Sequence, residues 1–166
     1  MKWWTNGYGN GSQNDGGDWK GIDGKEFQEL RNRYMERKNA VAVITARGGS
    51  KRIPHKNIKE FCGRPIIEYS IEAALKSGVF DEVMVSTDDS EIAEIAKRAG
   101  AAVPFYRSKE AAGDYAATHE VILEVLEEYE KRGVTFEKVC CIYPTAPFLT
   151  ADVLRESMER LEQTGA

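Results

Sequence analysis

Residues 46–57, with the sequence ARGGSKRIPHKN, combine the residue types that bind phosphate groups. Gly48 and Gly49 directly follow an apolar run, so the backbone can come close to a ligand there, and successive free N–H groups form a concavity that attracts anions. Arg47 and Lys51 add positive charge on either side of the glycines. The stretch has neither the Gly-Lys-Ser/Thr of a Walker A sequence nor the spacing of a GxGxxG turn. It predicts a site where backbone, arginine and lysine hold a nucleoside triphosphate. On residue types alone, the alternative is a solvated basic loop.

The elements that position this loop alternate between short apolar runs and helical periods. Runs at 40–45 (AVAVIT), 82–86 (EVMVS) and 138–143 (KVCCIY) are typical of strands buried on both faces of a parallel sheet, and 102–106 is a weaker strand candidate. Apolar stripes between and after them predict four helices, marked by Ile67/Ile71/Ala74/Leu75, Ile92/Ile95/Ala96/Ala99, Ile122/Val125/Leu126/Tyr129 and Leu154/Met158/Leu161.

Alternating strands and helices predict an α/β fold with an open, mostly parallel sheet covered on both faces. In such sheets the ligand binds at the carboxyl ends of the strands. The loops after Thr45, Ser86 and Tyr143 are therefore the expected places for chemistry.

The N-terminal part has a different composition. Residues 1–24 hold seven of the fifteen glycines and all three tryptophans without periodicity, which predicts a loop or a disordered tail. Residues 25–38 carry one weak apolar stripe and predict a polar helix. We therefore expect an N-terminal extension over 1–38 and a nucleotide-binding α/β domain over 39–166.

Overall composition narrows the class of protein. Apolar residues make up 42% of the 166 residues and charged residues 30%, as in ordinary globular proteins. A formal net charge of −4 argues against nucleic acid as a partner. The chain shows no membrane-spanning run and no signal peptide, so we expect a cytoplasmic protein without a membrane partner. The three cysteines lack metal-ligand spacing and predict reduced structural thiols.

The segment ITARGGSKRIPHKNIKEFCGRPIIEYSIEAA resembles the N-terminal signature of the acylneuraminate cytidylyltransferases, whose first strand enters an Ala-Arg-x-Gly-Ser-Lys-x-x-Pro-x-Lys-Asn loop that holds CTP. The resemblance implies a Rossmann-like nucleotidyltransferase fold. It also implies that Arg47 and Lys51 hold the triphosphate and stabilise the departing pyrophosphate. The nucleotide-binding residues expected in this loop are Ala46, Arg47, Gly48, Gly49, Ser50, Lys51, Lys56 and Asn57.

A second segment, VSTDD at 85–89, is similar to the family's strand-to-helix turn near the base and ribose. The resemblance implies that Ser86, Thr87 and Asp88 bind nucleotide. The alternative is that Asp88, Asp89 and Ser90 cap the following helix. Both can hold together.

The third segment, YPTAPF at 143–148, stands where sialic acid cytidylyltransferases carry Gln-Pro-Thr-Ser-Pro-Leu facing the acceptor sugar. The resemblance implies that Tyr143, Pro144 and Thr145 bind that sugar. Tyr143 in place of that glutamine, within CCIYPTAPF, resembles the pseudaminic acid branch. Because a tyrosine offers one hydroxyl and an apolar ring where glutamine bonds through both ends, we expect the preferred substituents on the sugar to differ from those of sialic acid. A turn imposed by two prolines is the structural alternative.

Family membership implies transfer of CMP from CTP to a nine-carbon 2-keto-3-deoxy sugar acid, such as pseudaminic or sialic acid, with Mg²⁺ as cofactor and a homodimer in the intact enzyme. Typical members continue well past the equivalent of Ala166, and their metal-binding acids and dimer-forming strands are expected there. We therefore expect a C-terminally truncated domain with little transferase activity of its own. The alternatives are a non-catalytic CTP-binding fragment and a related nucleotidyltransferase of the CMP-Kdo type.

Overall fold

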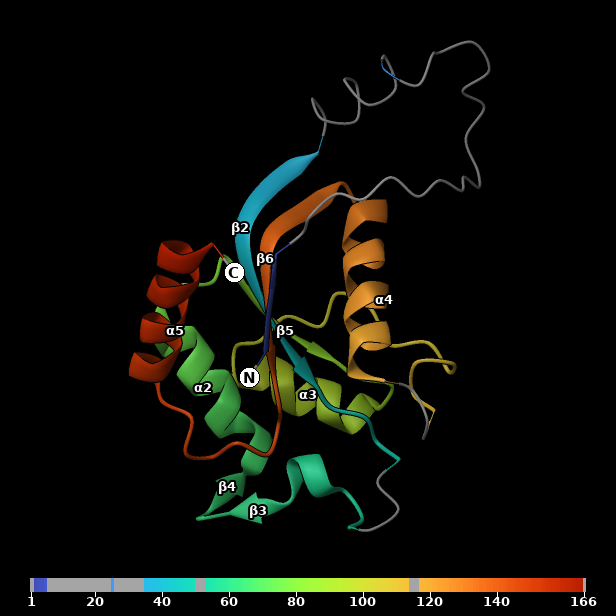
Figure 1. Cartoon of the computed structure of the whole chain (residues 1–166). Helices are drawn as coiled ribbons and strands as arrows, with labels where there is room; N and C mark the ends of the chain where they lie inside the picture. Colours follow the sequence, from blue (N-terminus) through green and yellow to red (C-terminus); the bar gives the residue numbers. More distant parts are fainter. Residues whose placement is uncertain (1, 6–24, 26–34, 50–52, 114–116, 166) are drawn as a thin grey trace, which may run out of the picture.

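A computed structural model describes residues 2–5, 25, 35–49, 53–113 and 117–165. Its main sheet has four strands in the order β1-β6-β2-β5. At its centre, β2 (Glu36–Thr45) pairs in parallel with β6 (Val134–Ile142) on one side and with β5 (Glu82–Ser86) on the other. β1 (Lys2–Thr5) is antiparallel to β6 at the edge (Figure 1). The predicted parallel α/β architecture is confirmed.

Helices cover both faces of this sheet. On one face lie α2 (Ile66–Ser77), α3 (Ser90–Arg98) and α5 (Ala151–Thr164), and on the other lies α4 (Thr118–Lys131) (Figure 1). The four apolar stripes of the sequence correspond to these four helices. None of the helices among the described residues is long and apolar enough to cross a bilayer.

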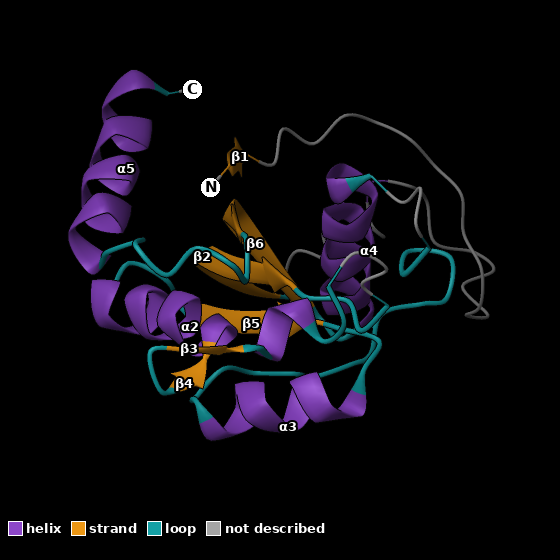
Figure 2. Ribbon diagram, turned by 90° about the horizontal axis from the view of Figure 1, so that it is seen from below, coloured by secondary structure: helices purple, strands orange, loops and turns teal. Residues whose placement is uncertain are grey.

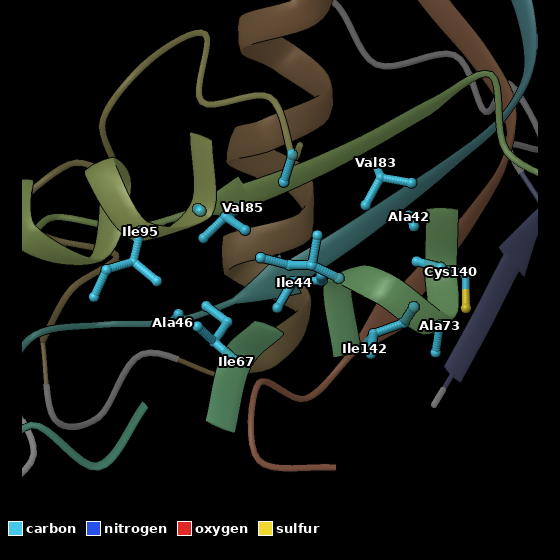
Figure 3. Packing of buried hydrophobic residues seen from close by; sticks show 14 of the residues in the cluster. Ala42, Ile44, Ala46, Ile67, Ala73, Val83, Val85, Ile95, Cys140 and Ile142 are labelled. Atoms are coloured by element: carbon cyan, nitrogen blue, oxygen red, sulfur yellow. The ribbon is translucent and has the colours of Figure 1, made fainter. Parts of the chain in front are cut away.

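The two helical layers explain why the strands are apolar throughout. Ala42 and Ile44 pack with residues of α2, α3 and α5, and Figure 3 shows them on the same side of the sheet as Ile67 and Ala73 of α2. Val41 and Val43 pack against α4 on the other face. In β6, Cys140 lies in the core with α2, α3 and α5, and Cys141 lies in the core with α4. Burial raises the pKa of the Cys140 thiol. Alternate residues of one strand thus enter opposite cores, as the two-residue period of a strand requires.

The connection between β2 and α2 contains short elements of its own. These are a 3₁₀ turn, η1 (Lys56–Ile58), and a two-stranded hairpin of β3 (Glu60–Phe61) and β4 (Arg64–Pro65). Figure 2 shows the hairpin beside the start of α2. The hairpin turn places Gly63 at φ 87°, a backbone conformation that glycine adopts without strain.

Two expectations for the N-terminal part need correction. Residues 36–38 lie in β2 and not in the expected helix, because β6 extends far enough to pair Glu36 with Val134. Residues 2–5 lie in β1 and not in a loop, because the outer edge of β6 offers them a hydrogen-bonding partner strand. The sequence did not indicate either strand, because β2 begins with polar residues and glycines follow β1. The remainder of the expected tail and helix falls largely outside the described residues.

The weak strand expected at 102–106 is also wrong. Only one parallel bridge forms, between Ala102 and Met84. Pro104 follows shortly after and has no N–H to donate to a ladder, which accounts for the early end of the pairing.

Candidate nucleotide-binding site

The carboxyl ends of the three parallel strands bring the predicted loops to one edge of the sheet. Thr45 at the end of β2 lies in register with Ser86 at the end of β5, and the Ala46 N–H donates to the Ser86 carbonyl at 2.9 Å. The loops that follow β2 and β6 leave the lower end of the sheet in Figure 1, beside the β3–β4 hairpin. Parallel strands and their shared direction therefore assemble the predicted segments into one region.

The glycine loop after β2 lies directly against the β5–α3 turn. The Gly48 N–H donates to Asp88 Oδ1 at 2.9 Å. A Cβ atom on Gly48 would lie 2.5 Å from Asp89 Oδ2 and 2.8 Å from Asp89 Cβ, so only glycine fits there. Among the described residues, nothing lies within 4 Å of an equivalent Cβ position on Gly49. Close packing therefore requires glycine at position 48, whereas the described surroundings leave room for a side chain at position 49.

The two aspartates of the turn have separate tasks. Asp89 caps α3, because its Oδ1 accepts from the N–H groups of Glu91 and Ile92 at 2.8 and 3.1 Å. Asp88 instead bonds the glycine loop. The capping alternative is thus confirmed for Asp89, and Asp88 is placed next to the predicted phosphate-binding backbone.

Asn57 fastens the far end of the loop to its beginning. Its side chain is buried within η1, and its Nδ2 donates to the Arg47 carbonyl at 2.8 Å. Its Oδ1 is buried and, among the described residues, accepts no hydrogen bond. Asn57 therefore shapes the backbone around Arg47 from inside and still carries an acceptor that is not engaged.

The positive groups of the loop are only partly described. Arg47 reaches across to the segment before α4, where its Nη1 donates to the Ala112 carbonyl at 3.5 Å. Lys56 is exposed on η1. Ser50 and Lys51, both predicted to bind phosphate, lie outside the described residues. Their assignment stays a prediction.

Ser86 and Thr87 are buried at the end of β5 and bond to the protein itself. The Ser86 hydroxyl accepts from Arg107 Nε at 3.0 Å, and Thr87 Oγ1 accepts from the Asp89 N–H at 3.1 Å. These contacts hold the turn in shape. Contact of either hydroxyl with nucleotide stays a prediction.

Arg107 is the site residue that the sequence analysis missed. Its guanidinium is buried and also donates from Nη2 to the Ser86 carbonyl at 2.7 Å, while its backbone N–H donates to the Thr87 carbonyl at 2.8 Å. Burial lowers its pKa, and the nearby carboxylates of Asp88 and Glu124 act in the opposite direction. The one signal in the sequence was a single arginine closing the apolar-aromatic run VPFY.

The predicted sugar-binding segment follows β6. Tyr143 is exposed, and its carbonyl accepts from the Ser70 hydroxyl at 3.0 Å, which ties the segment to α2. Pro144 is buried and Thr145 is exposed. Phe148 is 86% exposed and touches the hairpin residue Phe61 edge-on, with 6.2 Å between ring centroids. The segment therefore offers an exposed phenol and hydroxyl next to an aromatic pair.

No group of three or more His, Cys, Asp or Glu side chains arranged to hold a metal ion occurs among the described residues. The carboxylates of Asp88 and Asp89 already serve the glycine loop and the α3 cap.

Fold and site together define a Rossmann-like nucleotidyltransferase domain: a parallel sheet covered on both faces, with a glycine loop at the carboxyl end of its central strand. A cytidylyltransferase family model matches residues 41–166, and the chain belongs to that family.

Individual relatives agree with this assignment. A pseudaminic acid cytidylyltransferase of Campylobacter jejuni is 48% identical over 123 residues, which cover 74% of this chain and 53% of the relative. A CMP-N,N'-diacetyllegionaminic acid synthase of Legionella pneumophila is 38% identical over 125 residues, covering 75% and 54%. The chain therefore spans about half the length of the curated relatives it matches.

Among solved structures, a CMP:2-keto-3-deoxy-manno-octonic acid synthetase complexed with CTP superposes with a TM-score of 0.63 at 23% identity, covering 77% of this chain and 49% of that one. At this level of identity the likeness supports the fold.

Proposed function

We propose that this chain is the nucleotide-binding part of a cytidylyltransferase that joins CMP to a nine-carbon 2-keto-3-deoxy sugar acid and releases pyrophosphate. The observation that carries the proposal is the ARGGSKRIPHKN sequence, which follows the central strand in a chain that is 48% identical over 123 residues to a pseudaminic acid cytidylyltransferase. The Gly48 packing and the Asn57 bond to Arg47 hold the backbone at residues 47 and 48 in place.

In the proposed reaction the anomeric hydroxyl of the sugar attacks the α-phosphorus of CTP. Reactions of this kind depend on positioning and on neutralising charge, and need no covalent intermediate. Arg47 and Lys51 would bind the triphosphate and stabilise the pyrophosphate as it leaves. Asn57 would orient the loop and, through its unengaged Oδ1, a donor group of the nucleotide.

The proposed sugar is of the pseudaminic acid type. Tyr143 stands at the position where the sialic acid enzymes carry glutamine, and its exposed phenol would line the sugar pocket. The CMP-Kdo alternative is less favoured, because the more similar relatives act on nine-carbon acids of the pseudaminic and legionaminic type by name.

Mg²⁺ is proposed as the cofactor on the family resemblance alone. The described residues contain no group of three or more His, Cys, Asp or Glu side chains arranged to hold it. Dimerisation and a cytoplasmic location likewise remain proposals.

Isothermal titration with CTP, UTP, ATP and GTP, each with Mg²⁺, tests the nucleotide assignment. We expect selective binding of CTP. Equal binding of all four nucleotides, or binding of none, would contradict it. Mass spectrometry of mixtures with CTP, Mg²⁺ and pseudaminic or sialic acid then tests transfer; CTP binding without CMP-sugar formation would favour the non-catalytic alternative for this chain.

A further inference from the structure

The 103–113 loop borders the predicted nucleotide site and is fastened to it at two points. At one point, Arg107 bonds both Ser86 and Thr87 at the carboxyl end of β5. At the other, Ala112 accepts from the guanidinium of Arg47 in the glycine loop. The loop therefore links two segments that the family resemblance assigns to CTP.

At a third point, hydrogen bonds join this loop to α4, which lies on the opposite face of the sheet from α2 and α3. Glu124 Oε1 accepts from the Ser108 N–H at 2.7 Å, and Glu124 Oε2 accepts from the Ser108 hydroxyl at 2.7 Å. Both oxygens of the Glu124 carboxylate thus accept hydrogen bonds from Ser108, the residue directly after Arg107. Hydrogen bonds to a charged acceptor are stronger than those between neutral groups.

Glu124 is itself held by the core. Its helical neighbours Ile122 and Val125 are buried against the sheet, so the position of its backbone follows from the packing of α4. The Ser108 hydroxyl in turn accepts from the Ala111 N–H at 3.1 Å, which starts the turn leading to Ala112. A rigid helix therefore determines where the loop can lie.

Charge adds to this geometry. Burying a charged guanidinium costs free energy of desolvation, which nearby anionic groups can offset. Asp88 and Glu124 are the carboxylates that favour the charged form of Arg107, whereas Arg47 opposes it. Glu124 thus acts on Arg107 both through the adjacent Ser108 and through its negative charge.

We propose that Glu124 is a positioning residue for the nucleotide site: through Ser108 it holds Arg107 against Ser86 and the 103–113 loop against the glycine loop. This inference rests on the proposed function, since its consequence is weaker CTP binding when Glu124 is changed. Neither Glu124 nor Ser108 lies in the three motif segments at 44–74, 85–89 and 143–148.

The first test measures CTP binding by isothermal titration for Glu124→Ala, Ser108→Ala and the double variant, at a temperature where circular dichroism shows each to be folded. We expect each single change to weaken binding about tenfold, because a hydrogen bond to a charged group contributes at least about that factor. The double variant should lose little more than either single one, because the two residues form one fastening.

Two comparisons separate positioning from stability. Glu127→Gln, at an exposed position of the same helix, should bind CTP as the unchanged protein does. Glu124→Gln keeps an acceptor for the Ser108 N–H but removes the charge, and we expect an intermediate loss. CTP affinity that stays within about twofold in Glu124→Ala, even with a lowered melting temperature, would overturn the proposal.

A second readout needs no nucleotide. The Arg107 Nε–H donates to Ser86 Oγ and should give a protected side-chain signal in ¹⁵N NMR spectra, which disappears in Arg107→Lys and is thereby assigned. We expect Glu124→Ala to shift or broaden this signal and Glu127→Gln to leave it in place. If the unchanged protein binds no CTP, the proposed function fails, and the signal alone decides whether Glu124 positions Arg107. An unaltered signal in Glu124→Ala would overturn that role.

Discussion

The Asp88 carboxylate accepts a hydrogen bond from the Gly48 backbone N–H, with 2.9 Å between Asp88 Oδ1 and the nitrogen. Gly48 belongs to the loop in which backbone N–H groups are expected to hold phosphate oxygens. Asp88 thus places a negative charge beside the position proposed for the triphosphate. An incoming phosphate must either share this N–H with the carboxylate or displace it.

We therefore expect Asp88→Asn to tighten CTP binding about fivefold when Mg²⁺ is removed with EDTA. The amide can still accept from Gly48, whereas like charges about 4 Å apart repel by about 1 kcal/mol even in bulk water. Isothermal titration in EDTA measures the effect, with Glu94→Gln on the exposed face of α3 as a charge-matched control. Weaker binding by Asp88→Asn under these conditions would show that the carboxylate helps the nucleotide bind.

Gly48→Ala and Gly49→Ala form a matched pair. The first should lower the free energy of unfolding by about 1–3 kcal/mol, because the new methyl group meets Asp89 and forces the loop and the α3 cap apart. The second should stay within about 0.5 kcal/mol, because the space around Gly49 is open. Urea unfolding compares the two. Equal stabilities would mean that the loop and the β5–α3 turn are not packed as described.

Lys51→Ala should weaken CTP binding by about 1.5–3 kcal/mol, the usual range for a hydrogen bond between charged groups. Lys59 is exposed just after η1, so Lys59→Ala serves as the control and should leave the CTP affinity unchanged. Titration with CTP and Mg²⁺ gives both values. An unchanged affinity for Lys51→Ala would indicate that Lys51 is a solvated loop residue that does not contact the nucleotide.

Arg107→Lys should lower the free energy of unfolding by about 1–3 kcal/mol, because an ammonium group cannot make both bonds of the guanidinium to Ser86 and leaves buried acceptors unpaired. Arg98→Lys, at the exposed end of α3, should change stability by less than about 0.5 kcal/mol. Urea unfolding of both variants measures the difference, and equal values would argue against a structural role for Arg107.

A variant lacking residues 1–34 should bind CTP as the full chain does but self-associate more strongly. The deletion removes β1 and leaves the outer edge of β6 unpaired between Lys138 and Cys141, whereas the glycine loop follows β2 on the other side of β6. Sedimentation velocity measures association, and titration measures CTP affinity. A monomer with unchanged stability would show that β1 contributes nothing to covering this edge.

Local patterns in the sequence were sufficient for the class of fold and for the main site segments. The apolar runs of β2, β5 and β6 identify strands covered on both faces, and the helical stripes identify the layers that cover them. The glycine loop and its basic residues predict a phosphate site, because backbone freedom and charge are properties of neighbouring residues. Parallel strands then imply that the loops after Thr45, Ser86 and Ile142 meet.

Tertiary structure decided the contacts between residues far apart in the chain. The pairing of Glu36 with Val134 extends β2 through polar residues, and β1 reaches the edge of β6 from the other end of the sequence. Arg107 and Glu124 make their contacts because the 103–113 loop packs between β5 and α4. No local pattern marks such residues, because a charged side chain in a loop looks the same whether it is solvated or buried against a distant partner. Its role depends on which neighbours the fold brings within hydrogen-bonding distance.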